Sequence, residues 1–387
     1  MSRFDKITNR RNTNSIKWMG SENELPMWVA DMDFETADEI SNALIERANH
    51  KIFGYCDIPF EWNEAIYNWR KDRYNHIINK DELLYCTSVI ASISSVVRKI
   101  TSVGENVVIQ TPVYNIFYNC ILNNGRNVLE SPLAYKDGVY SIDFADLEDK
   151  LSQKQTSMMI LCNPHNPIGK AWDKEDLAKI GELCHKYDVV VLADEIHCDL
   201  TDPGVTYTPF SSVNDVCKNI SITCSSPTKT FNLAGLHTSY IYVPNPYLRH
   251  KVWRAINTDE VAEANVFAVT GAIAAFSHGH KWLDELRKYI KVNKEEFINQ
   301  VEASLPVKVM RSNATYLLWV DCSKICNDTT DLVEFILKET GLRVTAGKVY
   351  GDAGKAFIRV NIATQNSRVK DGIDRFITGV KAYINSK

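Results

Sequence analysis

The stretch Val189-Val-Val-Leu-Ala-Asp-Glu-Ile-His197 indicates the fold class of this chain. Its first five residues are continuously apolar, which is typical of a β-strand covered on both faces. A helical stretch, Lys174–Tyr187, comes before it and starts after Asp173, a residue type suited to the N-cap of a helix. Because a helix that leads into a doubly buried strand is typical of a βαβ unit, the stretch predicts a mainly parallel sheet.

Other short β-rich runs, with helical stretches between them, extend this pattern on both sides. These runs are Asn106–Gln110, Met158–Cys162, Ile220–Cys224 and Tyr240–Val243. A long helical region, 262–303, follows the last of them. We therefore expect an α/β fold whose large domain, residues 46–284, holds a mainly parallel, mixed sheet between helices.

The pattern changes after this helical region. Thr315–Asp321 alternates as a strand does, Thr330–Thr340 has a helical pattern, and Phe357–Ile362 is a further strand. We expect these residues to form a smaller α+β domain, residues 285–387, together with the N-terminal arm, residues 1–45.

Composition excludes several classes of function. The 387 residues include 44 Lys and Arg against 48 Asp and Glu, a net charge of −4, and 45% are hydrophobic. This is the balance of a globular protein with a large core, without the basic stripe that nucleic acid would favour. No apolar run approaches the ~18–20 residues of a membrane span, and no apolar signal segment follows the polar first residues. We predict a cytoplasmic protein that binds neither nucleic acid nor membrane.

Metal and disulfide chemistry are not predicted either. The ten cysteines are scattered and form no CxxC pair, which favours reduced, mostly buried thiols. His278-Gly-His280 is interpreted as a solvated helix end, and the sequence has no Walker A or HExxH motif.

The residues that follow the predicted strands carry the chemistry, because ligands of open α/β sheets bind at the carboxyl ends of strands. Asp194 ends one strand, Lys229 lies among hydroxyl residues after another, and Asn166 lies in a loop with two Asn-Pro pairs. Ser88 precedes a helix, Ser92–Ile100, whose N-terminus favours an anion by ~0.3–2 kcal/mol. Taken alone, each of these residues has a simpler role as a helix cap or a surface residue.

Together, the four features supply an amine nucleophile, a buried carboxylate, an amide and an anion site at one edge of one sheet. That set meets the needs of pyridoxal phosphate: a lysine for a Schiff base, an acidic partner for the pyridinium nitrogen, and a phosphate cradle.

Four motifs then carry a resemblance along nearly the whole chain. They are Asn163-Pro-His-Asn-Pro-Ile-Gly169, Ala193-Asp-Glu-Ile-His197, Ser226-x-x-Lys-Thr-Phe-Asn-Leu-Ala-Gly235 and Phe357-Ile-Arg-Val-Asn-Ile-Ala363. In their order and spacing they resemble the fold-type I pyridoxal-phosphate enzymes of the class I/II aminotransferase family. Two further segments, Pro26–Phe34 and Ala314–Trp319, are similar to the MalY/PatB branch of cystathionine β-lyases, also called C–S lyases.

The resemblance implies roles at the reactive end of the cofactor. Lys229 would hold pyridoxal phosphate covalently and move the Cα proton of the substrate. Asp194 would pair with the pyridinium nitrogen, and Asn166 would donate to the phenolic oxygen. His197 would tune that oxygen or support Asp194, with a packing role as the alternative. Tyr114 would stack on the ring and contact the substrate.

At the phosphate end, the resemblance implies backbone N–H groups of Ser88, Val89 and Ile90, and the hydroxyl of Ser226. His237 stands where aminotransferases commonly carry a phosphate-binding Arg. The family also often has Gly at the position of Ser88, so the loop geometry here is expected to differ.

Three residues would complete the site. Arg359 would clamp the α-carboxylate of the substrate, with a surface position on its strand as the alternative, and the backbone of Ala30 would lie close to that substrate. Tyr55 matches a tyrosine that reaches the phosphate of the neighbouring subunit in related dimers, so a homodimer with active sites at its interface is expected.

The branch resemblance favours a β-lyase that releases a thiol, pyruvate and ammonia from cystathionine or a cysteine S-conjugate. An aminotransferase that uses the same residues and a keto-acid acceptor is the alternative. A regulatory protein that uses the fold to contact partners is a third hypothesis, which the intact Lys229, Asp194, Asn166 and Arg359 disfavour.

Overall fold

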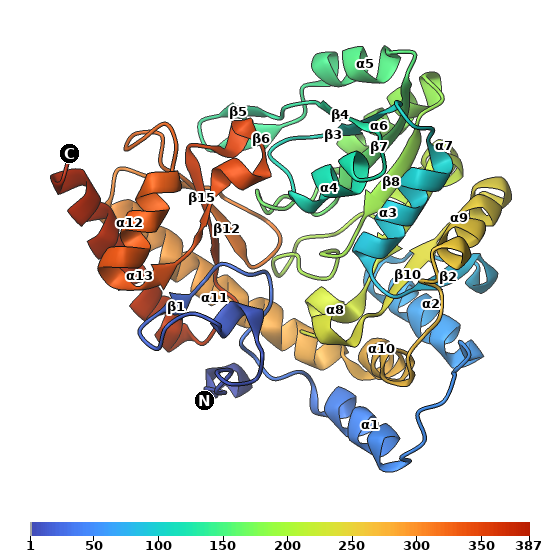
Figure 1. Ribbon diagram of the computed structural model, residues 1–387, viewed down its shortest axis with the longest axis horizontal. Coiled ribbons are helices and arrows are strands. Elements are labelled where there is room, and N and C mark those ends of the chain that lie inside the picture. The colour runs from blue at the N-terminus through green and yellow to red at the C-terminus, as the bar shows by residue number, and fades with distance from the viewer. Residues whose placement is uncertain (1) are drawn as a thin grey trace.

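A seven-stranded sheet forms the centre of the larger half of the molecule. The computed structural model describes residues 2–387, and the strand order of this sheet is β2-β10-β9-β8-β7-β3-β4 (Figure 1). The bounds are β2 Leu83–Cys86, β3 Asn106–Ile109, β4 Asn127–Glu130, β7 Thr156–Cys162, β8 Val190–Asp194, β9 Ser221–Ser225 and β10 Ser239–Tyr242. Only β10 runs antiparallel to its neighbours, which confirms the predicted mixed, mainly parallel sheet.

Apolar layers cover both faces of this sheet because alternate residues of a strand point to opposite sides. Val191 packs with α5 (Phe144–Ser152) and α6 (Lys174–Lys186), whereas its neighbour Leu192 packs with α3, α4 and α9. The bounds of these three helices are α3 Val89–Ile100, α4 Ile116–Leu122 and α9 Pro246–Thr258. Strand β8 is therefore covered on both sides, as its apolar sequence predicts.

The other half is built around a four-stranded antiparallel sheet of order β11-β12-β15-β14. Its strands are β11 Lys308–Val309, β12 Leu317–Asp321, β14 Thr345–Ala346 and β15 Phe357–Asn361. Helices α11 (His280–Ser304), α12 (Thr330–Thr340) and α13 (Asn366–Asn385) pack beside it (Figure 1). The predicted domain limits, residues 45 and 284, fall inside helices α1 (Asp38–Asn49) and α11, and the division itself stays a prediction.

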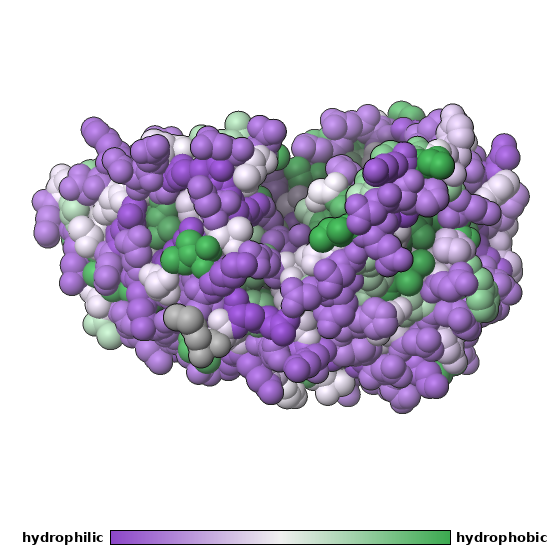
Figure 2. Space-filling model, turned by 90° about the horizontal axis from the view of Figure 1, so that it is seen from below, coloured by the Kyte–Doolittle hydropathy of each residue, from purple (hydrophilic) through white to green (hydrophobic). Residues whose placement is uncertain are grey.

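The N-terminal arm packs against the C-terminal half. Strand β1 (Leu25–Pro26) pairs in parallel with β13 (Leu342–Arg343), and the buried ring of Phe4 lies edge-on to Trp282. The remaining elements are α2 Phe60–Tyr74, α7 Asp215–Ile220, α8 Pro227–Thr230, α10 Val266–His278, β5 Ala134–Lys136 and β6 Val139–Ser141. Seen from below, the surface is mostly polar, and a notch lies between the two halves (Figure 2).

The long helical region predicted for residues 262–303 is wrong in two details. Helix α10 starts only at Val266, because the Asn265 side chain accepts the free N–H groups of the first turn. Helices α10 and α11 are separate, with Gly279 between them. A Cβ on Gly279 would lie 2.3 Å from the ring of Phe231, so the chain needs glycine there. Among the described residues, no helix is long and apolar enough to span a membrane.

Candidate active site

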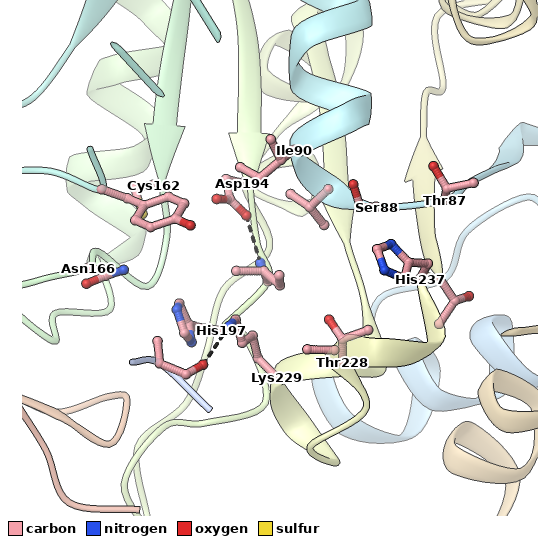
Figure 3. Close-up of a pocket in the computed structure, with 16 residues that line it drawn as sticks. Thr87, Ser88, Ile90, Cys162, Asn166, Asp194, His197, Thr228, Lys229 and His237 are labelled. Atoms are coloured by element: carbon pink, nitrogen blue, oxygen red, sulfur yellow. Dashed lines mark hydrogen bonds between the residues drawn. The ribbon is translucent and has the colours of Figure 1, made fainter. Parts of the chain in front are cut away.

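A cavity of about 240 Å³ opens at the carboxyl ends of β7, β8 and β9 (Figure 3). Ten of the residues predicted for the site line it: Ala30, Ser88, Val89, Ile90, Tyr114, Asn166, Asp194, His197, Lys229 and His237. They come together from segments far apart in the sequence because parallel strands end at the same edge of a sheet.

Lys229 reaches the cavity from α8, a single turn that follows β9. The turn starts with Ser226, whose Oγ accepts the N–H of Thr228, and with Pro227 at its first position. The Nζ of Lys229 donates to the carbonyl oxygen of Ala30 at 2.6 Å (Figure 3). Burial lowers the pKa of this amine to about 8. A neutral amine, the form that attacks carbonyl carbons, is therefore accessible near neutral pH.

Asp194 ends β8 beneath the same cavity. Its Oδ1 accepts the backbone N–H of Ile196 at 3.1 Å, and none of the described cationic side chains lies within ion-pair distance of it. Burial raises the pKa of this carboxyl to about 7. A buried carboxylate without a cation is costly, so the site favours a ligand that brings a positive N–H group to Asp194.

A polar group of His197, which lines the same cavity as Lys229, also lacks a partner. The Nδ1 of His197 is buried and makes no hydrogen bond, and burial lowers the pKa of this ring to about 3, which keeps it neutral. The ring lies edge-on to Tyr316. Packing alone therefore does not satisfy His197, and its free nitrogen leaves room for a ligand.

Arg359 lies on β15 and reaches the site from the other half. Its Nη1 donates to Oδ1 of Asn166 at 3.2 Å and its Nη2 donates to the carbonyl of Trp28 at 2.8 Å, while its Nε has no partner. The guanidinium lies 4.9 Å from the ring centre of Tyr350. Arg359 is buried rather than a surface residue, and it has no carboxylate within reach in the described chain. Its fork is thus available for the carboxylate of a ligand.

The first turn of α3 forms the anion end of the cavity. Its N-cap is Ser88, whose Oγ accepts the N–H of Ala91 at 3.1 Å, so the helix begins three residues earlier than predicted, at Val89. The N–H groups of Val89 and Ile90 therefore face the cavity as part of a helix N-terminus. His237 borders this end with a left-handed φ of 53°.

Three threonines in the cavity wall were missed by the sequence analysis: Thr87, Thr228 and Thr238. The Oγ1 of Thr238 is buried without a partner, which is the condition of a hydroxyl that awaits a ligand. Thr228 adjoins Lys229 in the sequence, so the run of hydroxyl residues around that lysine was the signal that would have found it.

Three predicted residues are not part of the cavity lining: Arg359, described above, Ser226 and Tyr55. The Oγ of Ser226 donates to the carbonyl of Thr238 at 2.6 Å. Tyr55 is fully exposed, in a segment between α1 and α2 that has no regular structure. The contacts of Ser226 and Tyr55 with a phosphate group stay predictions. Among the described residues, no cluster of three or more His, Cys, Asp or Glu side chains could hold a metal ion.

Comparison with known proteins places this geometry in a family. The family model for aminotransferase class I and II matches residues 23–376. The chain is 41% identical to cystathionine beta-lyase PatB of Bacillus subtilis strain 168, over 96% of this chain and 98% of that protein. It is 31% identical to protein MalY of Escherichia coli K12, over 98% of this chain and 99% of that protein.

A solved structure agrees. The PLP-bound C–S lyase of Staphylococcus hominis superposes with a TM-score of 0.92, at 32% identity, over 98% of either chain. The family and the branch predicted from the sequence are confirmed. With a lysine and a carboxylate set across one cavity at the strand ends, and a family model that spans most of its length, this chain belongs to the aminotransferase class I and II family.

Proposed function

We propose that the protein is a pyridoxal-phosphate-dependent C–S β-lyase, which cleaves cystathionine or cysteine S-conjugates to a thiol, pyruvate and ammonia. One observation carries the proposal: the amine of Lys229 and the unpaired carboxyl of Asp194 line the same cavity, in a chain 41% identical to a cystathionine beta-lyase. The lyase of Staphylococcus hominis, PLP-bound in its own structure, supports the cofactor.

The residues present fit this cofactor. The uncompensated carboxyl of Asp194 calls for a protonated ring nitrogen, and the orphaned hydroxyl of Thr238 suits a phosphate at the N-terminus of α3. Tyr114 would stack on the ring, and the free amide nitrogen of Asn166 would donate to its phenolic oxygen. When bound, pyridoxal phosphate withdraws electrons from the Cα of an amino-acid substrate.

The side chains of the site then move one proton. Arg359 holds the α-carboxylate of the substrate, and the free amine of Lys229 takes the proton from Cα. The bond between Cβ and sulfur breaks as the Cα–Cβ double bond forms, and the ammonium of Lys229 returns the proton to the leaving thiolate. Water hydrolyses the released enamine to pyruvate and ammonia.

Arg359→Lys should raise the KM for cystathionine by roughly 10–100-fold and change kcat much less, because a single ammonium replaces two charge-assisted hydrogen bonds with one. Initial rates of thiol release over a range of substrate concentrations would measure this. Arg375→Lys is the matched control, because the guanidinium of Arg375 lies outside the cavity lining and donates to the backbone carbonyls of Asn23 and Thr340. An unchanged KM would show that Arg359 does not bind the substrate.

The function is tested with L-cystathionine and the cofactor-loaded protein, with and without 2-oxoglutarate. Pyruvate, ammonia and homocysteine formed without the keto acid would establish the lyase. If no elimination occurs, and amino transfer from a panel of amino acids requires the acceptor, the aminotransferase hypothesis replaces the lyase.

We further propose that the enzyme is a cytoplasmic homodimer. All ten cysteines are free thiols, which supports a reducing setting. Ile52, Phe53, Tyr55 and Phe60 are large apolar or aromatic side chains exposed along one short segment, at 65%, 57%, 102% and 62%. A second copy of the chain would cover them and receive Tyr55 at its phosphate end.

A mixture of two inactive variants tests the dimer. If Tyr55→Ala and Lys229→Ala are each inactive, refolding them together should restore about a quarter of the wild-type active sites, because half of the dimers are mixed and each has one intact site. Thiol release by the refolded mixture measures the recovery. Lack of any recovery in dimers shown to be mixed would contradict a Tyr55 that acts across the interface.

A further inference from the structure

One irregular segment, residues 28–34, contributes Ala30 to the cavity wall beside Lys229; we call it the strap. It contains neither helix nor strand, and side chains from other parts of the chain hold its carbonyl groups. Arg359 donates to Trp28, Asn361 donates to Val29 and Asp31, and Asn232 donates to Met32 and Phe34. Both halves of the molecule thus fix the path of the strap.

The carbonyl of Ala30 differs from the others because Lys229 is one of its two side-chain donors. The Nζ of Lys229 donates to it at 2.6 Å and the hydroxyl of Tyr316 donates to it at 3.2 Å. Tyr316 is fully buried just before β12, outside the cavity lining. Burial raises the pKa of this hydroxyl far above its ordinary range, so Tyr316 stays a neutral donor.

We propose that Tyr316 is a positioning residue for Lys229. Its hydroxyl donates to the same Ala30 carbonyl oxygen as the free amine of Lys229, so it holds that carbonyl in place and competes with the amine for it. The inference rests on the proposed function for its catalytic meaning. Lys229 must be free at two stages, before the cofactor binds and after the substrate displaces it. In the ligand-free structure Nζ donates to the Ala30 carbonyl.

The competition has a definite sign. A carbonyl oxygen offers two lone pairs, and an oxygen that already accepts one hydrogen bond is a weaker acceptor for the second. The Tyr316 hydroxyl therefore weakens the bond that stabilises the ammonium form of Lys229, which makes the proton easier to lose. Removing the hydroxyl should strengthen that bond and raise the pKa of the amine.

Other charged and titratable groups also act on this amine and are unchanged by the substitution. The carboxylates of Asp31 on the strap and Asp194 on β8 raise the pKa of Lys229, and Arg359 on β15 lowers it. The neutral ring of His197 and the hydroxyl of Tyr114 face the same cavity, with His237 at its anion end. Because these groups stay in place, the substitution of Tyr316 is expected to shift the pKa of Lys229 alone.

The test is Tyr316→Phe, which removes one oxygen and keeps the ring that packs against His197. In the full-length protein stripped of cofactor, a trace amine reagent labels Lys229 at a series of pH values, and peptide mass spectrometry quantifies the label. We expect the midpoint of labelling to rise by about 0.5 pH unit, so that labelling below the midpoint slows about threefold. The rate of pyridoxal phosphate capture should shift in parallel.

Tyr140→Phe is the matched control, because it also removes a buried hydroxyl that is hydrogen-bonded, to Trp319, outside the cavity lining. It should leave the Lys229 midpoint unchanged. A midpoint that stays in place or falls in a folded Tyr316→Phe protein would overturn the inference, even if the lyase activity is established. Conversely, a protein that never captures pyridoxal phosphate would defeat the proposed function, while the labelling still decides the role of Tyr316.

Discussion

Lys229→Ala is expected to lower thiol release from cystathionine by at least about 10⁴-fold, because one side chain supplies both the anchor for the cofactor and the base that takes the Cα proton. Lys229 differs from the other lysines because it lines the cavity, its pKa is lowered to about 8, and its Nζ donates to the Ala30 carbonyl of the strap. The substitution removes no ion pair, since the described residues place no carboxylate within 4.0 Å of its amine.

Rescue by a small amine sharpens this experiment. The substitution leaves a space that ethylamine can enter, and added ethylamine should restore part of the proton transfer in proportion to its neutral fraction. Lys170→Ala, which loses one hydrogen bond to the carbonyl of Tyr140, serves as the control and should keep nearly full activity. If Lys229→Ala kept more than about 1% of wild-type activity without added amine, the assignment of the base would be wrong.

Asp194→Asn is expected to lower kcat by roughly 10³-fold in the cofactor-loaded enzyme, because a neutral amide no longer holds a proton on the ring nitrogen and the ring accepts electrons poorly. Substrate binding through Arg359 is untouched, so the KM should change little. Steady-state rates with saturating pyridoxal phosphate would separate the two constants. An equal loss in kcat with Asp173→Asn, an exposed carboxylate at the N-cap of α6, would point to a general defect instead.

Asp194→Asn lowers the activity but should raise the stability of the cofactor-free protein. The pKa of Asp194 is about 7 in the folded chain against 3.8 for an unperturbed aspartate. The folded state therefore binds more protons between these values, and the stability contributed by this group is lost as the pH rises through that window. Urea unfolding at pH 5 and pH 8 should show cofactor-free Asp194→Asn gaining on the order of 2–4 kcal/mol over wild type at the higher pH. Parallel pH dependences for the two proteins would contradict an uncompensated carboxyl.

The residues that the sequence places at strand ends were predictable, and their meeting was predictable too. Asp194, Asn166 and Lys229 follow strands whose apolar runs show in the sequence, and a parallel sheet brings such ends to one edge. Local chemistry explains the small errors. The side chain of Ser88 caps α3, and Gly279 leaves space for the ring of Phe231 between α10 and α11. The helix limits at these two places therefore differ from those that the hydrophobic periodicity predicted.

Tertiary contacts of the strap were beyond sequence reasoning. The family resemblance implied that Arg359 clamps a carboxylate, but nothing local shows that Asn361 would hold Val29 and Asp31, 332 and 330 residues away. The role of Tyr316 was hidden for the same reason, since a tyrosine before an apolar strand is typical of a core residue. Such contacts depend on how two sheets pack, and periodicity contains no information about that.

The contacts of the strap also determine at which stage of synthesis and folding the active site can form. A ribosome delivers Ala30 long before Lys229, and both before Arg359 and Asn361, the anchors of Trp28 and Val29. Contacts this distant in sequence form late in folding, after the local helices. A growing chain can thus complete the central sheet, with Asp194 and Lys229 already at its edge, before Ala30 is held in the cavity wall. Lys229 therefore meets its complete surroundings only after Arg359 and Asn361 have been synthesised and have bound the strap.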